Sequence, residues 1–370
     1  MKRRTEEYAR RLDAVGAQWS QPSEESPRHV AHFGDPAQEY DHVQQGGLGL
    51  VDASARDTLV ASGDDVVTWL QGLVTNDVFA LAQPGTGQRT HAVNHIGRTI
   101  ADIRVAHLMD VLIMDFEPGN LLAKGFLKHL RQHVIMEKVR LHDRSQDVGR
   151  ITLIGHDAPQ ALDELADPED PTRTLRVHHA TTGYLGADVT IQRVEWAGTW
   201  GFDLMMERAD AHRVWDRLMT LPEAKPVGFE ALELLRKEAG VPRFGQEYDE
   251  RVIPIEADLN HTIDYDKGCY LGQEVIHRLD TRGRPAKMLR AIVPQQDLPL
   301  EAQLALYVQK KKVGNLRSAF RSPKAARAIG LAYVKRGSYD PGTAVEVLLE
   351  DGTRAPAQVM TLEDFSQLKG

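Results

Sequence analysis

Cysteine is almost absent from this sequence, and long apolar runs are absent altogether. The 370 residues include one cysteine, Cys269, which excludes an intrachain disulfide and a zinc site built on a cysteine pair. No uninterrupted apolar stretch approaches the roughly 20 residues that a membrane-spanning helix needs. The N-terminal MKRRTEEYARRLDAVGAQW has basic residues with no apolar region after them, so it lacks the pattern of a secretory signal. We therefore expect a cytoplasmic protein with no membrane partner and no metal site.

Negative charge is missing from one part of an otherwise acidic chain. The net charge of −8 and the pI of about 6.0 exclude a protein that binds nucleic acid along its whole length. No carboxylate lies between Glu301 and Asp340, whereas the basic window 310–336 holds nine lysines and arginines. The favoured interpretation is a solvated loop and strand edge, where lysines block edge pairing. The alternative is a local site for phosphate, RNA or a polycarboxylate tail.

The texture of the chain changes three times. Polar residues dominate 1–45, which we expect to form a short helix and an irregular N-terminal extension. Residues 46–170 and 171–286 each combine strand-like and helix-like stretches without strict alternation, which favours α+β sheets over a doubly wound parallel fold. Short β-rich runs split by glycine, proline and basic turns fill 287–370. The predicted fold class is α+β, with two adjacent mixed α/β sheet domains and a small C-terminal β-barrel.

The single thiol lies in a segment with unusual local chemistry. A helix can begin at Leu271, and Gly268 and Gly272 allow tight turns on either side of Cys269. Cys269 would then lie at or just before a helix N-terminus, beside the ammonium group of Lys267. Such settings lower the pKa of a thiol from about 8.5 to roughly 3.5–7.5. The alternative is a small, buried, inert residue, which describes most free cysteines.

Asp102 lies in TIADIRV, an apolar alternating strand in which a lone carboxylate is unusual. A buried carboxylate needs hydrogen-bond partners or a shifted pKa, and both are frequent at functional sites. The alternative is an edge strand from which Asp102 points to water. Asn94 and Arg98, on the same expected hairpin, are weaker candidates.

The thiol segment resembles the YgfZ family of folate-binding proteins, which are relatives of the glycine cleavage T-protein. That family carries K-G-C-[YF]-x-G-Q-E, and the sequence here is K-G-C-Y-L-G-Q-E. Similar stretches follow the family order over residues from about 46 to 360. These further matches are at 48–77, 97–105 (G-R-x-x-A-D), 235–260 (R-x-E-x-G-x-P-R-x-G) and 313–334.

The resemblance implies a three-domain fold around a folate site, with tetrahydrofolate or a formyl or methylene derivative as the ligand. It implies roles in the site for Asn76, Arg236 and Glu238, beside Asp102 and Cys269. Lys267 is a candidate from its own chemistry, because its ammonium group beside the thiol could hold an anion. From the residues alone, Asn76 belongs to a helix-end turn, and Arg236 and Glu238 could equally form surface pairs of little energetic weight.

Two departures from the T-protein pattern concern the site itself. The Asp-Asp pair of T-proteins is Ala101-Asp102 here, and their Tyr-Thr-Gly-Glu turn is 196–199, Trp-Ala-Gly-Thr. One carboxylate and the pterin-contacting glutamate are therefore replaced.

Three functions remain open at this stage. The first is a tetrahydrofolate-binding accessory protein of the YgfZ type, with Cys269 as functional thiol, which supports iron–sulfur enzymes or assembly proteins and through them tRNA modification. The second is a tetrahydrofolate-dependent aminomethyl- or methyltransferase that uses Asp102. The third is a non-enzymatic scaffold that binds RNA through 310–336.

Overall fold

The computed structural model describes the chain except residues 1–3, 23–26, 82, 166–179, 196–197 and 369–370. It divides into two compact units. The first comprises Met1–Thr90 and Ala101–Leu235, and the second comprises His91–Ile100 and Arg236–Gly370. The predicted division into four parts, with boundaries at 45, 170 and 286, stays a prediction, because the two compact units do not test those boundaries.

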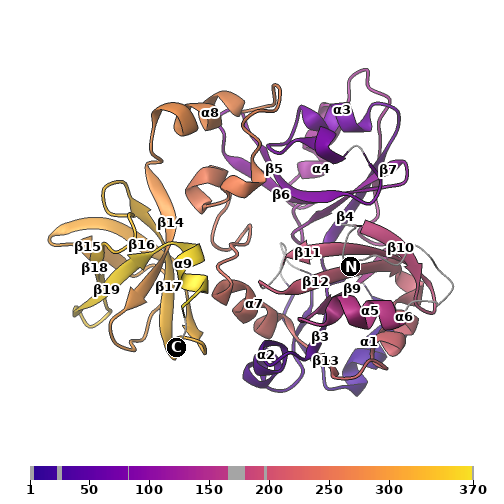
Figure 1. Cartoon of the computed structure of the whole chain (residues 1–370), viewed down its shortest axis with the longest axis horizontal. Coiled ribbons are helices and arrows are strands. Elements are labelled where there is room, and N and C mark those ends of the chain that lie inside the picture. Colours follow the sequence, from indigo (N-terminus) through magenta and orange to yellow (C-terminus); the bar gives the residue numbers. More distant parts are fainter. Residues whose placement is uncertain (1–3, 23–26, 82, 166–179, 196–197, 369–370) are drawn as a thin grey trace. The chain divides into compact units, whose positions relative to one another are not determined.

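Two sheets dominate the first unit (Figure 1). A five-stranded sheet has the order β5-β6-β7-β4-β8, and a six-stranded sheet has the order β10-β11-β12-β9-β3-β13. In the second sheet β13 runs parallel to β3, while β9 runs antiparallel to β3, so this sheet is mixed. The strands of the five-stranded sheet are β4 (Asp57–Ser62), β5 (Gly87–Val93), β6 (Thr99–Leu108), β7 (Val111–Phe116) and β8 (Arg140–Asp143). Those of the six-stranded sheet are β3 (Leu48–Asp52), β9 (Val148–Ile154), β10 (Ala180–Tyr184), β11 (Asp188–Glu195), β12 (Trp200–Glu207) and β13 (Ala224–Pro226).

Helices supply the apolar cover of these sheets. Tyr8 and Leu12 of the first helix are fully buried, and the Tyr8 ring meets Trp215 edge-on at 5.9 Å. The N-terminal extension is therefore part of the core, together with a two-stranded sheet of β1 (Gln18–Trp19) and β2 (Val30–His32). The helices of this part of the chain are α1 (Glu6–Ala14), α2 (Pro36–Gln44), α3 (Val66–Gln71), α4 (Phe126–Gln132), α5 (Ala158–Leu165), α6 (Ala211–Leu218) and α7 (Phe229–Glu238).

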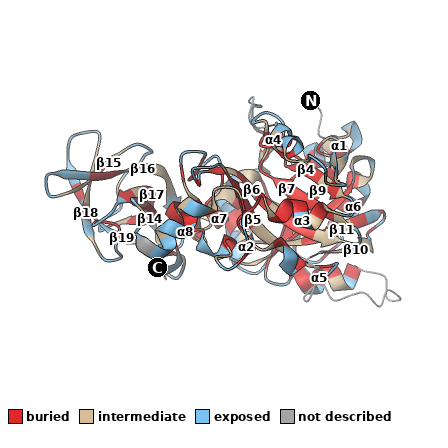
Figure 2. Ribbon diagram, turned by 90° about the horizontal axis from the view of Figure 1, so that it is seen from above, coloured by how far each residue is buried: buried red, intermediate tan, exposed pale blue. Residues whose placement is uncertain are grey.

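The six-stranded sheet has two faces of opposite character, because successive side chains of a strand point to opposite sides. Ile151, Leu153 and Leu204 belong to an apolar core that also contains Trp215 of α6. The opposite face carries four buried polar or charged residues, which are Arg150, Thr152, Gln192 and Asp203, as well as apolar ones. Figure 2 shows that most strand residues of this unit are buried.

The second unit contains a closed six-stranded barrel in the order β14-β17-β16-β15-β18-β19. The basic window forms β16, β17 and the turns beside them, where Lys310, Lys324 and Arg336 lie. A closed barrel has no edge, so the expected strand edge is wrong. The elements of this unit are α8 (Gln273–Arg282), β14 (Lys287–Pro294), β15 (Ala305–Val308), β16 (Lys311–Ser322), β17 (Arg327–Lys335), β18 (Ala344–Leu348), β19 (Arg354–Met360) and α9 (Leu362–Ser366).

The predicted fold class is confirmed: two mixed α/β sheet layers are followed by a small barrel. Among the described residues, no helix is both long and apolar enough to cross a bilayer.

Candidate functional site

A layer of paired charges lies between the two sheets of the first unit. Arg150 of β9 is 1 % exposed and forms ion pairs with Asp115 of β7 and with Asp203 of β12, the latter at 3.2 Å. Arg56 binds Asp115 at 2.6 Å, and Arg150 also donates to the hydroxyl of Thr58 on β4 at 2.8 Å. Strands from both sheets therefore meet through charged side chains rather than through apolar packing.

The charges of this layer depend on one another. Burial alone would raise the pKa of Asp203, but Arg150, Arg104 and Arg56 outweigh it and hold that pKa below its usual range. Burial also lowers the pKa of Arg150 to about 10. Both charged groups of a buried ion pair lose their hydration, and hydrophobic packing of similar volume is often as stable. The buried pairs are therefore not explained by stability alone, and they give the protein interior a polar surface that a polar ligand could contact.

Asp102 lies on the same face of β6 as Arg104, and its side chain is 10 % exposed. Its two carboxylate oxygens accept from Arg89 of β5, at 3.0 Å from Nε and 2.7 Å from Nη2. Strand β6 lies between β5 and β7, so the alternative of an edge strand with Asp102 in water is wrong. The carboxylate is partly buried, paired and held in a fixed orientation.

Asn76 supports the strand that carries Arg89. Its side-chain amide donates to the carbonyl of Arg89 at 3.1 Å, and its backbone N–H donates to the hydroxyl of Thr90 at 2.9 Å. The turn after α3 is thus tied to β5 immediately beside the Arg89–Asp102 pair. A direct role of Asn76 in ligand binding stays a prediction.

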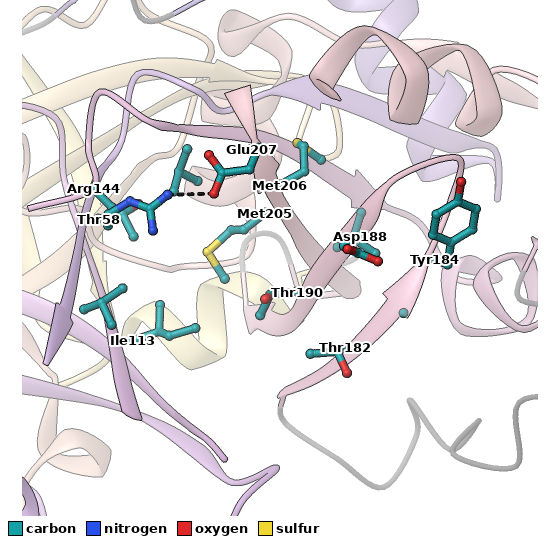
Figure 3. Close-up of a pocket in the computed structure, with 14 residues that line it drawn as sticks. Thr58, Ile113, Arg144, Thr182, Tyr184, Asp188, Thr190, Met205, Met206 and Glu207 are labelled. Atoms are coloured by element: carbon teal, nitrogen blue, oxygen red, sulfur yellow. Dashed lines mark hydrogen bonds and ion pairs between the residues drawn. The ribbon is translucent and has the colours of Figure 1, made fainter. Parts of the chain in front are cut away.

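A groove of about 590 Å³ opens along the same inter-sheet layer. Figure 3 shows Arg144 and Glu207 joined on one side and Tyr184 and Asp188 on the β10–β11 hairpin, with Met205 between them. The Arg144–Glu207 contact is 2.7 Å. Thr58 lines this groove and accepts a hydrogen bond from Arg150 of the buried charge layer, so the groove borders the layer.

The thiol segment belongs to the second unit. Cys269 is exposed, so the alternative of a buried inert residue is wrong. Helix α8 begins at Gln273, two residues after the expected start at Leu271, and the Gln273 amide donates to the carbonyl of Tyr270 at 3.2 Å. Cys269 therefore precedes the helix and is not at its N-terminal residue. The Lys267 ammonium lies 5.0 Å from the centre of the Tyr270 ring. A place for Cys269 at the rim of a pterin cavity stays a prediction.

Gly272 explains part of the motif. It has φ +81°, and a Cβ there would lie 2.3 Å from the Asn94 carbonyl oxygen. Only glycine combines this backbone conformation with so close an approach. Asn94 accepts from the amides of Ile96 and Arg98 at 3.1 and 3.0 Å, so it shapes the turn between β5 and β6.

Arg236 and Glu238 are buried, so the alternative of weak surface pairs is wrong. Arg236 binds Glu247 at 2.9 Å, and both side chains are at most 1 % exposed. Glu238 accepts from the hydroxyl of Ser322 and, at 3.2 Å, from the amide of Lys324. Both residues anchor the 236–260 segment within the second unit, and their role as ligands for a folate stays a prediction.

Most cations of the basic window have partners in the barrel or beside it. Arg317 binds Asp249 at 2.7 Å, and Arg321 binds Asp297 at 2.6 Å. Arg327 donates to the carbonyls of Ala325 and Pro294, while Lys310, Lys311 and Lys312 are exposed. Besides the run 310–312, the window exposes Arg321, Lys324, Lys335 and Arg336, of which Arg321 is paired with Asp297.

Sequence reasoning missed the partners of Asp102 and the charge layer behind them. Arg89 and Arg150 lie in strand-like stretches, QRTHAV and DVGRITLI, in which a lone arginine is as unusual as the lone Asp102. The argument that a lone charge in an apolar strand needs a partner, applied to arginine, would have identified Arg89 and Arg150.

Two family models match this chain. Residues 3–267 match the GCVT N-terminal domain, and residues 287–365 match the glycine cleavage T-protein C-terminal barrel domain. The chain belongs to the glycine cleavage T-protein family.

Relatives in the T-protein family cover most of the chain. An aminomethyltransferase of Herpetosiphon aurantiacus is 28% identical over 309 residues, which are 82% of this chain and 83% of the relative. An aminomethyltransferase of Caldanaerobacter subterraneus is 24% identical over 82% of this chain and 81% of its own length. The crystal structure of the glycine cleavage system aminomethyltransferase T from Bartonella henselae superposes with a TM-score of 0.86 at 19% identity, covering 100% of this chain and 99% of that one, which shows a shared fold.

Aminomethyltransferases of the T-protein family use tetrahydrofolate, in agreement with the ligand predicted from the sequence. Trp196 and Ala197, the first half of the segment that replaces the family's Tyr-Thr-Gly-Glu turn, lie outside the described residues, and Thr199 is partly buried.

Proposed function

We propose that this protein binds a tetrahydrofolate on the polar inner layer of the first unit and transfers a one-carbon group, aminomethyl or methyl, to or from it. The observation that carries the proposal is the Arg89–Asp102 pair: a central-strand carboxylate, 10 % exposed, whose orientation is fixed by two hydrogen bonds. Asp102 is also the one acidic residue that the sequence retains from the Asp-Asp pair of T-proteins.

The inner layer has polar groups that suit a pterin. Gln192 of β11 is 3 % exposed, and its side-chain oxygen has no hydrogen-bond partner among the described residues. Gln192 and Thr190 share the face of β11 opposite the apolar core residues Val189 and Ile191. An unpaired buried acceptor costs about 1–3 kcal/mol, and the N–H groups of a pterin ring could satisfy it.

The protein's own residues would bind the tetrahydrofolate and orient the Asp102 carboxylate toward it. Arg89 fixes the direction of the Asp102 carboxylate, and Asn76 fixes the backbone at Arg89. A tetrahydrofolate would supply the nitrogen that carries the one-carbon group. Asp102 would lie against that nitrogen and stabilise positive charge there, while Arg89 keeps both carboxylate oxygens in place.

A calorimetric titration of the protein with 5-formyl-tetrahydrofolate tests the binding step. Asp102→Asn should weaken binding, or in a transferase assay lower turnover by roughly 10²-fold, because an amide lacks the negative charge. Asp110→Asn is the matched control, since Asp110 is exposed in the turn at the other end of β6. The folate proposal fails if the unmodified protein shows no binding at high micromolar ligand.

A second candidate is the YgfZ-type accessory role, in which the protein supports iron–sulfur enzymes and indirectly tRNA modification. The exposed Cys269 within K-G-C-Y-L-G-Q-E favours it. The two roles differ in their sensitivity to mutation. A transferase should lose turnover with Asp102→Asn and tolerate Cys269→Ala, whereas an accessory protein should show the reverse in a cellular assay of an iron–sulfur enzyme.

A further inference from the structure

A second hollow, of about 390 Å³, lies within the second unit, and one of its lining residues, Glu247, is the ion-pair partner of Arg236. We call it the Tyr333 pocket. Its wall is formed by β16 and β17 of the barrel, by Lys287 of β14, and by the 247–252 segment. It holds the only phenol hydroxyl of the barrel strands that is buried without a partner among the described residues.

The Tyr333 hydroxyl is a hydrogen-bond donor that this part of the chain leaves unused. Its oxygen is buried and has no partner in the described ranges, although the ring packs against the cluster of Phe244 and Tyr248. Burial, with the nearby carboxylates of Glu256 and Asp249, raises the pKa of Tyr333 well above its usual value, so the phenol keeps its proton. A buried, protonated, unpartnered O–H is suited to an acceptor from outside the chain.

The carboxylates around this pocket are already bound. Glu247 accepts from Arg236 at 2.9 Å and from Ser318 at 3.0 Å. Asp249 accepts from Arg317 at 2.7 Å and from Arg251. Each of these two carboxylates is therefore paired with a guanidinium, which offsets part of its negative charge.

The groups that remain favour an anion. The Lys287 ammonium lies 4.7 Å from the centre of the Tyr333 ring, and its one ion pair, with Glu256, is at 3.9 Å. Arg317 uses Nε and one Nη for Gln246 and Asp249, and no contact engages its other Nη in the described structure. Apolar contacts come from Leu316 and Val252.

The backbone at one wall is held in an uncommon conformation. Gln303 has φ +73°, which is unfavourable for a residue with a side chain. Its amide donates to the carbonyl of Leu316 at 2.8 Å, and its carbonyl accepts from the Asn315 side chain at 2.8 Å. These bonds hold Gln303, which lines the pocket, in place.

We propose that the Tyr333 pocket binds a small organic carboxylate, whose oxygens accept from the Tyr333 hydroxyl and lie beside Lys287 and Arg317. The carboxylate is either a free molecule or the glutamate end of a larger one. This inference does not depend on folate chemistry in the first unit.

Calorimetric titration of the full chain with glutarate, p-aminobenzoyl-glutamate and inorganic phosphate tests the proposal. Binding of both carboxylates with similar affinity indicates a free ligand, and preference for p-aminobenzoyl-glutamate indicates a glutamate end. Tyr333→Phe should weaken carboxylate binding about tenfold, the value of one hydrogen bond to a charged acceptor. Tyr307→Phe is the control, because Tyr307 lies on β15 with its ring under Arg354.

A melting curve without ligand gives the second readout. Tyr333→Phe should not lower the melting temperature, because the hydroxyl has no partner to lose among the described residues. Added glutarate should raise the melting temperature of the unmodified protein more than that of the variant at the same concentration. The proposal is overturned if neither carboxylate binds at 10 mM (about the weakest affinity of interest), if phosphate alone binds, or if Tyr333→Phe destabilises the ligand-free protein.

Discussion

The surroundings of Asp102 and of Cys269 differ in almost every physical respect, although both residues stood out in the sequence. Asp102 lies on a central strand, 10 % exposed, with both oxygens bound by Arg89. Cys269 is exposed, in a segment between regular elements, and belongs to the other compact unit. A buried charge demands partners and is therefore fixed in place, whereas an exposed thiol makes no such demand. The first region is built for precise orientation and the second for access.

The largest expected effect is on the charge layer beside Asp102. Arg150→Met should lower the free energy of unfolding by about 3–5 kcal/mol, because Asp115 and Asp203 are left buried with a partner missing. Urea denaturation measures this value. Arg144→Met is the control, since Arg144 and Glu207 are 36 % and 65 % exposed and such pairs contribute less than about 1 kcal/mol. If both variants lost the same small amount of unfolding free energy, the charge layer would be accessible to water, contrary to its burial in the structure.

A smaller loss is expected at the pair itself. Arg89→Met should destabilise the first unit by about 2 kcal/mol, the scale of a charge-assisted hydrogen-bond pair that keeps some solvent contact. It should also weaken binding of 5-formyl-tetrahydrofolate, because Asp102 would lose its fixed direction. Gln88→Met, at the neighbouring position on β5, controls for a change of side chain on this strand. Unchanged ligand affinity in Arg89→Met would contradict the orienting role.

The second unit should have an acid sensitivity of its own. Burial alone would raise the pKa of Asp249, but hydrogen bonds from Arg251 and the charge of Arg317 outweigh it and lower the pKa to about 2. Because the folded-state pKa lies below the ordinary 3.8, the stabilisation is complete above about pH 4 and is lost as the pH falls toward 2. Asp249→Asn should flatten that part of the curve of unfolding free energy against pH. A curve of unchanged slope would contradict the pairing.

The smallest effect is expected at the thiol. Cys269→Ala should change the free energy of unfolding by less than about 0.5 kcal/mol, since an exposed side chain leaves no cavity. The same residue should be alkylated by iodoacetamide in the native protein as readily as after unfolding. Strong protection in the native state would place Cys269 in an interior and remove the contrast with Asp102.

Much of the fold could be predicted from residue patterns. The helix at VVTWLQ, the strands of TIADIRVAHL and ITLI, and the β-rich C-terminus follow from apolar periodicity and turn residues. Strand β16 escaped prediction because its many cations hide the strand period, and only the barrel shows that Arg317 and Arg321 have carboxylate partners.

The site could be predicted only in part, because pairing is a tertiary property. Asp102 was found since one carboxylate in an apolar strand needs an explanation, but its partner Arg89 lies thirteen residues earlier, on another strand. The network of Arg56, Arg150, Asp115 and Asp203 joins three strands of two sheets and the turn before β4, and no local sequence pattern predicts it. The burial of Arg236 could not be predicted from the sequence either, because its partner Glu247 follows an irregular segment.

The most direct test of the central claim is a crystal structure of the protein grown with 5-formyl-tetrahydrofolate. Pterin density against the Asp102 carboxylate, with Arg89 still bound to it and Gln192 now hydrogen-bonded, is the predicted result. Density that places the folate elsewhere, or an inner layer filled by side chains alone at saturating ligand, would contradict it.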